Sequence, residues 1–263
     1  MSADGFAPDH LASLPATRLP GGGALYADGV ETAAPPMLFV HGGYHGAWCF
    51  GGWMRLLAPA RRVFAVDMAG HGTLPHATLD PRQGIGDWAA DVAAAVRRIG
   101  TPPVLVGHSL GALAVMLAAT EVAAARLVLL APSPPGNLPG VAAVPLVDDG
   151  APVPPPDAAA ASARWFGGDR PDFLADWLAR LGPESPTVLN DRYGLRTCLD
   201  PARIAAPVLV VEAGRDDAAR HPAGQDEAIA RFLRGRHVLL PDAVHCLMAG
   251  PGWWEAAALV ADQ

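Results

Sequence analysis

The chain has 263 residues, 51% of them hydrophobic, with no lysine and a formal net charge of −7 at pH 7. That length suits one domain with an insertion, and the negative charge without a dense basic cluster argues against nucleic acid or anionic membranes as partners. No apolar run reaches the roughly 18 residues of a membrane span, and residues 1–5 lack the basic and apolar regions of a secretory signal. We therefore expect a soluble cytoplasmic protein; its oligomeric state is left open.

Short apolar runs alternate with helical patterns along most of the chain. Residues 16–30 predict a hairpin that turns at three glycines and forms an antiparallel edge. Strands are then expected at 37–40, 62–67, 103–107, 126–131, 207–213 and 237–240, and helices at 50–58, 84–99, after residue 109, at 223–233 and at 252–261. Buried strands that alternate with helices predict a mostly parallel α/β sheet covered on both faces.

The segment 132–200 breaks this alternation. Nine prolines fall between Pro132 and Pro156, which excludes regular structure there and indicates a long loop. Helical patterns follow at 157–166, at 169–181 and within 185–197. We expect 132–200 to form a helical cap inserted into a core made of residues 1–131 and 201–263.

A serine lies on the turn between a predicted strand and a predicted helix. Gly107-His108-Ser109-Leu110-Gly111 follows the apolar run that begins at Pro103, and an alanine-rich run comes directly after it. This context favours a nucleophile elbow, because the flanking glycines allow the strained turn that exposes the serine hydroxyl. The turn also leaves the Leu110 amide at a helix N-terminus, where negative charge is favoured.

Serine needs a base and a group that orients the base. Strand 207–213 runs into Asp216 and Asp217, and the last strand is followed by His245. All of these residues come after the carboxyl ends of strands, where open α/β sheets build their sites. The chain order of Ser109, an aspartate and His245 predicts a nucleophilic triad in which either aspartate could orient the histidine.

These motifs together resemble the α/β-hydrolase superfamily. The resemblance rests on His41-Gly42-Gly43, the segment around Ser109, Gly214-Arg215-Asp216-Asp217 and Asp242-Ala243-Val244-His245, and it spans about residue 35 to 261. The segment 41–49 is similar to the methylesterase and hydroxynitrile lyase branch. The resemblance implies an eight-stranded sheet, picks Asp217 as the triad acid through the pattern G-x-x-D, and assigns the oxyanion hole to the backbone amides of Gly43 and Leu110.

The cap and the loops beside the elbow supply candidate pocket residues. They are aromatic or imidazole side chains near the predicted site: His41, Tyr44, His108, Trp165, Phe166 and Trp177. Core packing competes with a pocket role for each of them. The three cysteines suit buried thiols, of which Cys246 follows the triad histidine. No histidine spacing indicates a metal site, and no cofactor is expected.

The sequence thus predicts a serine hydrolase that cleaves a carboxylic ester or thioester of a small, largely apolar substrate. Aspartate-nucleophile relatives are disfavoured by Ser109, and a hydroxynitrile lyase is disfavoured because this chain lacks the lysine that such lyases use. C–C bond hydrolases or lyases, cofactor-free oxygenases and acyltransferases keep the same triad, and they stay open as alternatives. A non-catalytic protein of this fold that binds a small ligand is the alternative from another class.

Overall fold

The computed structural model describes residues 5–263. The expectation that residues 1–5 lack the regions of a secretory signal falls mostly on residues 1–4, which lie outside the described residues. An eight-stranded sheet forms the centre of the protein, with the strand order β1-β2-β4-β3-β5-β6-β7-β8. Among residues 5–263, no helix is both long and apolar enough to cross a membrane.

The sheet is antiparallel at one edge and parallel elsewhere. The hairpin strand β1 (Ala16–Arg18) pairs with β2 (Ala24–Asp28), and β2 pairs in antiparallel fashion with β4 (Val63–Asp67). The remaining strands are parallel neighbours: β3 (Met37–Val40), β5 (Val104–His108), β6 (Arg126–Leu130), β7 (Val208–Ala213) and β8 (Arg236–Leu240). This confirms the predicted fold class.

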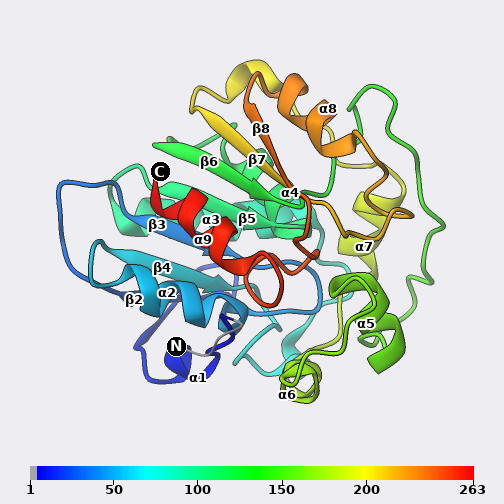
Figure 1. Cartoon of the computed structure of the whole chain (residues 1–263), viewed down its shortest axis with the longest axis horizontal. Coiled ribbons are helices and arrows are strands. Elements are labelled where there is room, and N and C mark those ends of the chain that lie inside the picture. The colour runs from blue at the N-terminus through cyan, green and yellow to red at the C-terminus, as the bar shows by residue number, and fades with distance from the viewer. Residues whose placement is uncertain (1–4) are drawn as a thin grey trace.

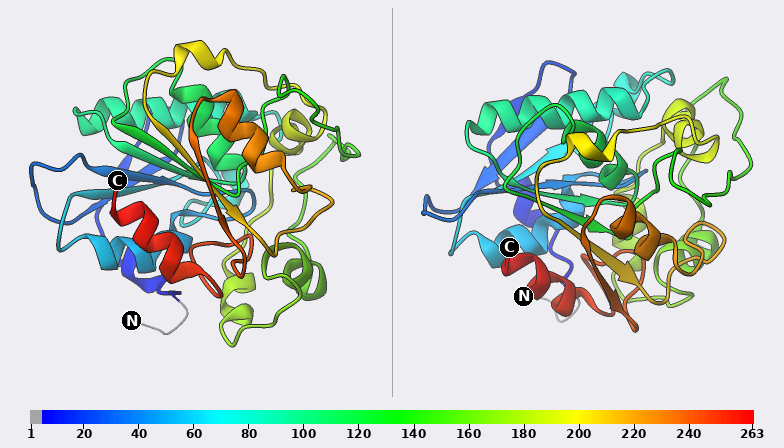
Figure 2. Two further views of the ribbon diagram at one scale, coloured as in Figure 1. Left: turned by 45° about the horizontal axis from the view of Figure 1, so that its top comes forward. Right: turned by 90° about the horizontal axis from the view of Figure 1, so that it is seen from above.

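Helices cover both faces of the sheet. In Figure 2, α3 (Ile85–Ile99) and α4 (Leu110–Ala118) lie on one face, and α2 (Gly51–Leu57) and α9 (Trp253–Ala261) on the other. Helix α8 (Gln225–Phe232) packs against β7 and β8, and the short α1 (Asp9–Ala12) packs against α2. Because both faces are covered, β3 and β5 are buried along their whole length, as the apolar runs predict.

Local sequence explains how several helices begin and end. Helix α3 buries Trp88 and Val92 on its apolar face and ends at Gly100, whose φ of 83° is the left-handed conformation that glycine adopts at helix ends. Helix α7 (Pro186–Tyr193) begins with proline, and the Ser185 hydroxyl accepts hydrogen bonds from the first turn. Residues 5–263 also contain three short 3₁₀ helices: Ala47–Phe50, His76–Thr78 and Pro201–Arg203.

Three helices lie between β6 and β7 in the chain and gather beside one end of the sheet (Figure 1): α5 (Ala158–Trp165), α6 (Leu174–Ala179) and α7. The helix expected over 169–181 was too long, since α6 begins only at Leu174. Asp169 lies outside α6, and its carboxylate pairs with Arg215 at 2.9 Å. The long loop predicted from the prolines connects β6 to α5.

Candidate active site

Ser109 occupies a strained turn between β5 and α4. Its φ of 53° and ψ of −120° lie outside the regions that side chains favour. A Cβ atom on Gly107 would lie 2.6 Å from the Cα of Ala112, and one on Gly111 would lie 2.2 Å from the carbonyl oxygen of His41. Both glycines are therefore required by close backbone approach, and the turn has the geometry expected of a nucleophile elbow.

Gly111→Ala should destabilise the protein. A methyl group at this position meets backbone atoms of two neighbouring residues, and overpacking of this kind costs about 1–3 kcal/mol or more. Urea denaturation would measure the loss in free energy of unfolding. Gly86→Ala is the matched control, because Gly86 is likewise the second residue of a helix but has nothing within 4 Å of an added Cβ; this variant should be at least as stable as the wild type. Equal stability of the two variants would contradict the proposed tight contact.

His245 is held by Asp216. The Nδ1–H of His245 donates to Asp216 Oδ2 at 2.7 Å, and both side chains are only 6% exposed. Burial by itself raises the pKa of Asp216, but the nearby His245 and His221 outweigh it and keep the pKa below its ordinary value. A buried carboxylate in this position fixes the histidine tautomer that leaves Nε2 free to accept a proton.

The choice of Asp217 as the acid in contact with the histidine was wrong. Asp217 Oδ2 accepts from Arg220 at 2.6 Å, and its Oδ1 accepts from the amide of Ala219. The backbone amide of Asp217 in turn donates to Asp216 Oδ1. The loop conformation after β7 therefore turns the first aspartate towards His245 and the second towards the turn that follows.

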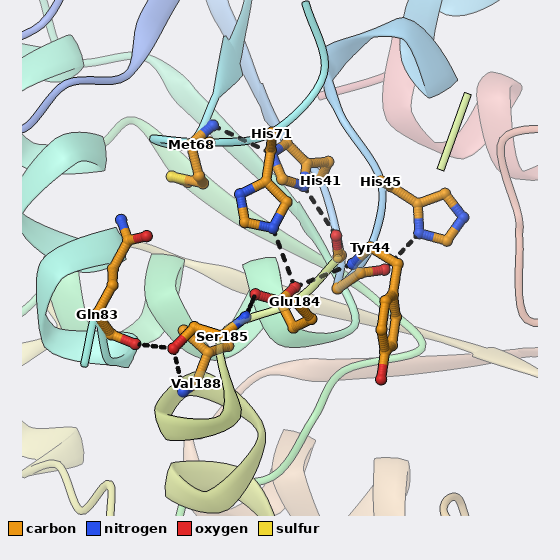
Figure 3. A network of polar contacts seen from close by, with 12 residues as sticks. His41, Tyr44, His45, Met68, His71, Gln83, Glu184, Ser185 and Val188 are labelled. Atoms are coloured by element: carbon orange, nitrogen blue, oxygen red, sulfur yellow. Dashed lines mark hydrogen bonds and ion pairs between the residues drawn. The ribbon is translucent and has the colours of Figure 1, made fainter. Parts of the chain in front are cut away.

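The backbone of Tyr44 is held by the segment that precedes α7. Its N–H donates to Glu184 Oε2 at 2.9 Å, and its carbonyl accepts from the amide of Gly182. Glu184 is fully buried and also accepts from His71 Nε2 at 3.2 Å; Figure 3 shows its carboxylate between the two partners. Tyr44 has a φ of 67°, so these contacts support an unfavourable backbone conformation next to Gly43.

Gly43 and Leu110, the two expected oxyanion-hole residues, adjoin each other. A Cβ atom on Gly43 would lie 2.8 Å from Leu110 Cδ1. Leu110 begins α4 directly after Ser109, where backbone amides point out of the helix. Ser109, Leu110 and His245 line the same pocket. In the described residues, no hydrogen bond joins the Ser109 hydroxyl to His245; such catalytic contacts tighten when substrate binds.

The pocket at Ser109 is lined mainly by polar side chains and differs from the expected one. None of the six predicted pocket residues belongs to it. Trp165, Phe166 and Trp177 are at most 2% exposed and pack into the core. The lining consists of Ser109, Leu110, Ser133, Arg164, Arg192, Tyr193, Asp216, Asp217, Arg220, His221 and His245. Two of the predicted six adjoin lining residues: the Tyr44 ring lies 5.5 Å from the Arg164 guanidinium, and the centroid of the His108 ring lies 4.7 Å from that of His245.

The buried histidines beside the elbow are packing residues held in one tautomer. His41 Nδ1–H donates to the carbonyl of Gly42, and His41 Nε2 accepts from the amide of Met68. His108 Nε2–H donates to the carbonyl oxygen of His245 at 2.9 Å. Burial lowers the pKa of both rings well below the ordinary value. His108 therefore fixes the backbone of the loop that carries His245 and stays uncharged.

His45 and Cys246 lie behind the site. Burial lowers the pKa of His45 to about 3, and its Nε2 accepts from Trp177 Nε1 at 3.1 Å. Cys246 is buried with its Sγ 4.0 Å from the same nitrogen, so it packs against this cluster and does not line the pocket. Cys49 is buried too, but Cys198 is exposed, contrary to expectation.

Sequence reasoning missed His221. Its Nδ1 lies 3.8 Å from a carboxylate oxygen of Asp216 and equally far from one of Asp226. Burial lowers its pKa, but the two carboxylates outweigh burial and raise it. Ligand atoms of Asp216, His221 and His245 lie within 4.8 Å of one another, which is close enough for a metal ion. The same Asp216 oxygen already accepts from His245, so a metal would have to displace the contact that orients the histidine.

A strand order of this kind, with a strained serine after β5 and a histidine after β8, defines an α/β-hydrolase-fold protein. Residues 37–262 match the family described as the alpha/beta hydrolase family. The chain belongs to that family.

Curated relatives agree with this family, and solved structures share its fold. A probable esterase, PIR7A, from Oryza sativa subsp. indica is 39% identical over 95 residues, which cover 34% of this chain and 35% of that protein. The match therefore spans about a third of the curated relative. Methylesterase MES16 from Arabidopsis has a TM-score of 0.68 at 18% identity, covering 87% of this chain and 98% of that one. A probable hydrolytic enzyme from Pseudomonas aeruginosa reaches 0.70 at 18% identity, covering 95% and 93%.

Proposed function

We propose that this protein is a serine esterase that hydrolyses a carboxylic ester or thioester of a small substrate. The observation that carries the proposal is the pocket at the elbow, which is lined by both the strained Ser109 and the Asp216-bound His245. Esterase names among the relatives, PIR7A and MES16, support the same reaction class. Residues 132–200, which carry α5 to α7, would serve as the cap over this pocket.

The proposed reaction has two halves. His245 Nε2 takes the proton of the Ser109 hydroxyl as its oxygen attacks the ester carbonyl. The amides of Leu110 and Gly43 would stabilise the oxyanion, and each such donor typically contributes on the order of 100- to 1,000-fold in rate. His245 then returns the proton to the departing alcohol. A water molecule, deprotonated by His245, then attacks the acyl-enzyme. His245 returns this proton to the Ser109 oxygen as the bond to the acyl group breaks, which releases the acid and restores the free hydroxyl.

Asp216 takes the part of the third triad residue in this proposal, in place of Asp217. Its carboxylate would hold His245 in the productive tautomer and stabilise the imidazolium that forms during each half-reaction. Tyr44 and Glu184 touch neither proposed nucleophile nor base; their contribution is to hold the backbone beside Gly43.

Labelling with a fluorophosphonate probe tests the activated serine. The wild type should be labelled and should release p-nitrophenol from p-nitrophenyl butyrate, while Ser109→Ala should do neither. Ser133→Ala is the matched control, because Ser133 lines the same pocket and its amide donates to the Ser109 carbonyl, but Ser133 does not occupy the strained turn; this variant should still be labelled. Labelling that persists in Ser109→Ala, or a wild type that neither labels nor turns over, would overturn the proposal.

A further inference from the structure

Three arginines line the pocket of a chain that is acidic overall. They are Arg164 on α5, Arg192 on α7 and Arg220 after β7. Two carboxylates face them, but both are engaged: Asp216 pairs with His245, and Asp217 pairs with Arg220. Within the described part of the chain, Arg164 and Arg192 form no ion pair within 4.0 Å. The wall of the pocket is therefore positively charged.

Arg192 is the unusual member of this set. It is only 5% exposed, and its Nη2 donates to the carbonyl oxygen of Arg220 at 3.3 Å. Its Nη1 is buried and has no hydrogen-bond partner in the residues that the structure describes. Burial, and secondarily the charge of Arg220, lowers its pKa to about 10. Keeping a guanidinium away from water without a carboxylate costs free energy, so the fold places an unmet positive charge in the wall of the pocket that Ser109 also lines.

Two other lining residues, Arg164 and His221, also favour a negatively charged ligand in this pocket. The Arg164 guanidinium lies over the Tyr44 ring and its Nη2 donates to the hydroxyl of Tyr193 at 3.4 Å. His221 lies in the same wall. Planar guanidinium groups bind carboxylates through paired N–H donors, a geometry that a neutral ester chain does not satisfy.

We infer that the substrate of this site is a small ester that carries a carboxylate, and that Arg192, with Arg164, binds this carboxylate while Ser109 attacks the ester group. The inference rests on the proposed esterase function and specifies its substrate class. It replaces the largely apolar substrate expected from the aromatic residues of the cap, because those residues are packed in the core. Monoesters of short dicarboxylic acids have the required chemistry.

Binding is measured first, independently of catalysis. Glutarate should raise the melting temperature of the Ser109→Ala protein. Most of this shift should be lost in a double variant that carries Arg192→Gln as well. Arg97→Gln, which removes an exposed arginine on α3, is the matched control and should keep it. The substrate assignment is overturned if glutarate does not raise the melting temperature of Ser109→Ala. It is also overturned if glutarate raises the melting temperature equally with and without the added Arg192→Gln change. Inorganic phosphate serves as the second anion: a shift with phosphate and none with glutarate would also overturn the carboxylate assignment.

Selectivity is measured next with monomethyl glutarate and methyl valerate, which differ only in a carboxylate against a methyl group. The ratio of their kcat/KM values in the wild type should exceed that of Arg192→Gln by about 10- to 100-fold, the worth of a hydrogen bond to a charged group. Equal ratios would overturn the inference even if both esters are cleaved. A wild type that binds glutarate but is not labelled by the fluorophosphonate would instead refute the esterase proposal alone. Arg192→Gln should melt no lower than the wild type, which excludes misfolding as the cause.

Discussion

Asp216→Asn should lower kcat by about 10⁴-fold, the loss typical of a triad whose orienting carboxylate becomes an amide. Asp216 is the side chain that accepts the Nδ1–H of His245, at 2.7 Å. An asparagine amide would donate to Nδ1 instead, which moves the ring proton to Nε2 and removes the base that Ser109 needs. Steady-state hydrolysis of p-nitrophenyl butyrate at pH 8 measures the effect.

Asp217→Asn provides the matched control for this variant. The two aspartates are adjacent, but Asp217 is bound to Arg220 and to the amide of Ala219. Its loss should change kcat by less than about tenfold, in keeping with the small energies of partly exposed ion pairs. The reverse order of effects, with Asp217→Asn the more damaging, would show that the loop rearranges and that Asp217 orients His245 in solution. Near-equal melting temperatures would exclude unfolding as the reason for either loss.

Strong local sequence patterns explain why the sheet and the turn at Ser109 were predictable from the sequence. The apolar runs of β3 and β5 are buried on both faces, so no polar residue interrupts them. The glycines around Ser109 are fixed by backbone contacts that admit no side chain. A single sequence reveals both features, because one is a run of apolar residues and the other is a short motif around one serine, although Gly111 itself meets His41 from another segment of the chain.

The identity of the aspartate that contacts His245 and the identity of the residues that line the pocket depend on tertiary structure. Whether Asp216 or Asp217 faces His245 is decided by the loop after β7, and a shift of one residue reverses the answer. The aromatic residues of α5 and α6 suggest an apolar pocket. In the structure, however, Trp165 and Trp177 are buried, and the pocket is lined by Arg164 and Arg192. Spacing identifies one apolar side of each helix, since the buried residues of α5 and of α6 are three or four positions apart. It does not say whether that side faces the core or a substrate pocket.

Glu184→Ala should destabilise the protein by about 3–5 kcal/mol near pH 6, the cost of breaking a buried ion pair from one side. The Glu184 carboxylate accepts from the amides of Tyr44 and Ser185 and from His71, as Figure 3 shows. All of these donors would lose their partner in a site that water does not reach. The free energy of unfolding from urea denaturation measures the loss, and kcat should fall as well because Tyr44 adjoins Gly43.

The pH dependence of Glu184→Gln isolates the charge on Glu184. Burial lowers the pKa of His71, but Glu184 outweighs it and raises the pKa above its ordinary value. A raised pKa gives stability that is fully present below the unfolded value near 6.5 and is lost as pH rises through the folded value. The stability difference between wild type and Glu184→Gln should therefore be larger at pH 6 than at pH 9. Burial keeps the pKa of His41 and His45 far below the ordinary value, and the charge on His71 lowers both further. Both rings are therefore neutral between pH 6 and pH 9 in either protein and cancel in this difference. A difference that is constant, or that grows with pH, would mean that His71 is neutral and that Glu184 acts only through its hydrogen bonds.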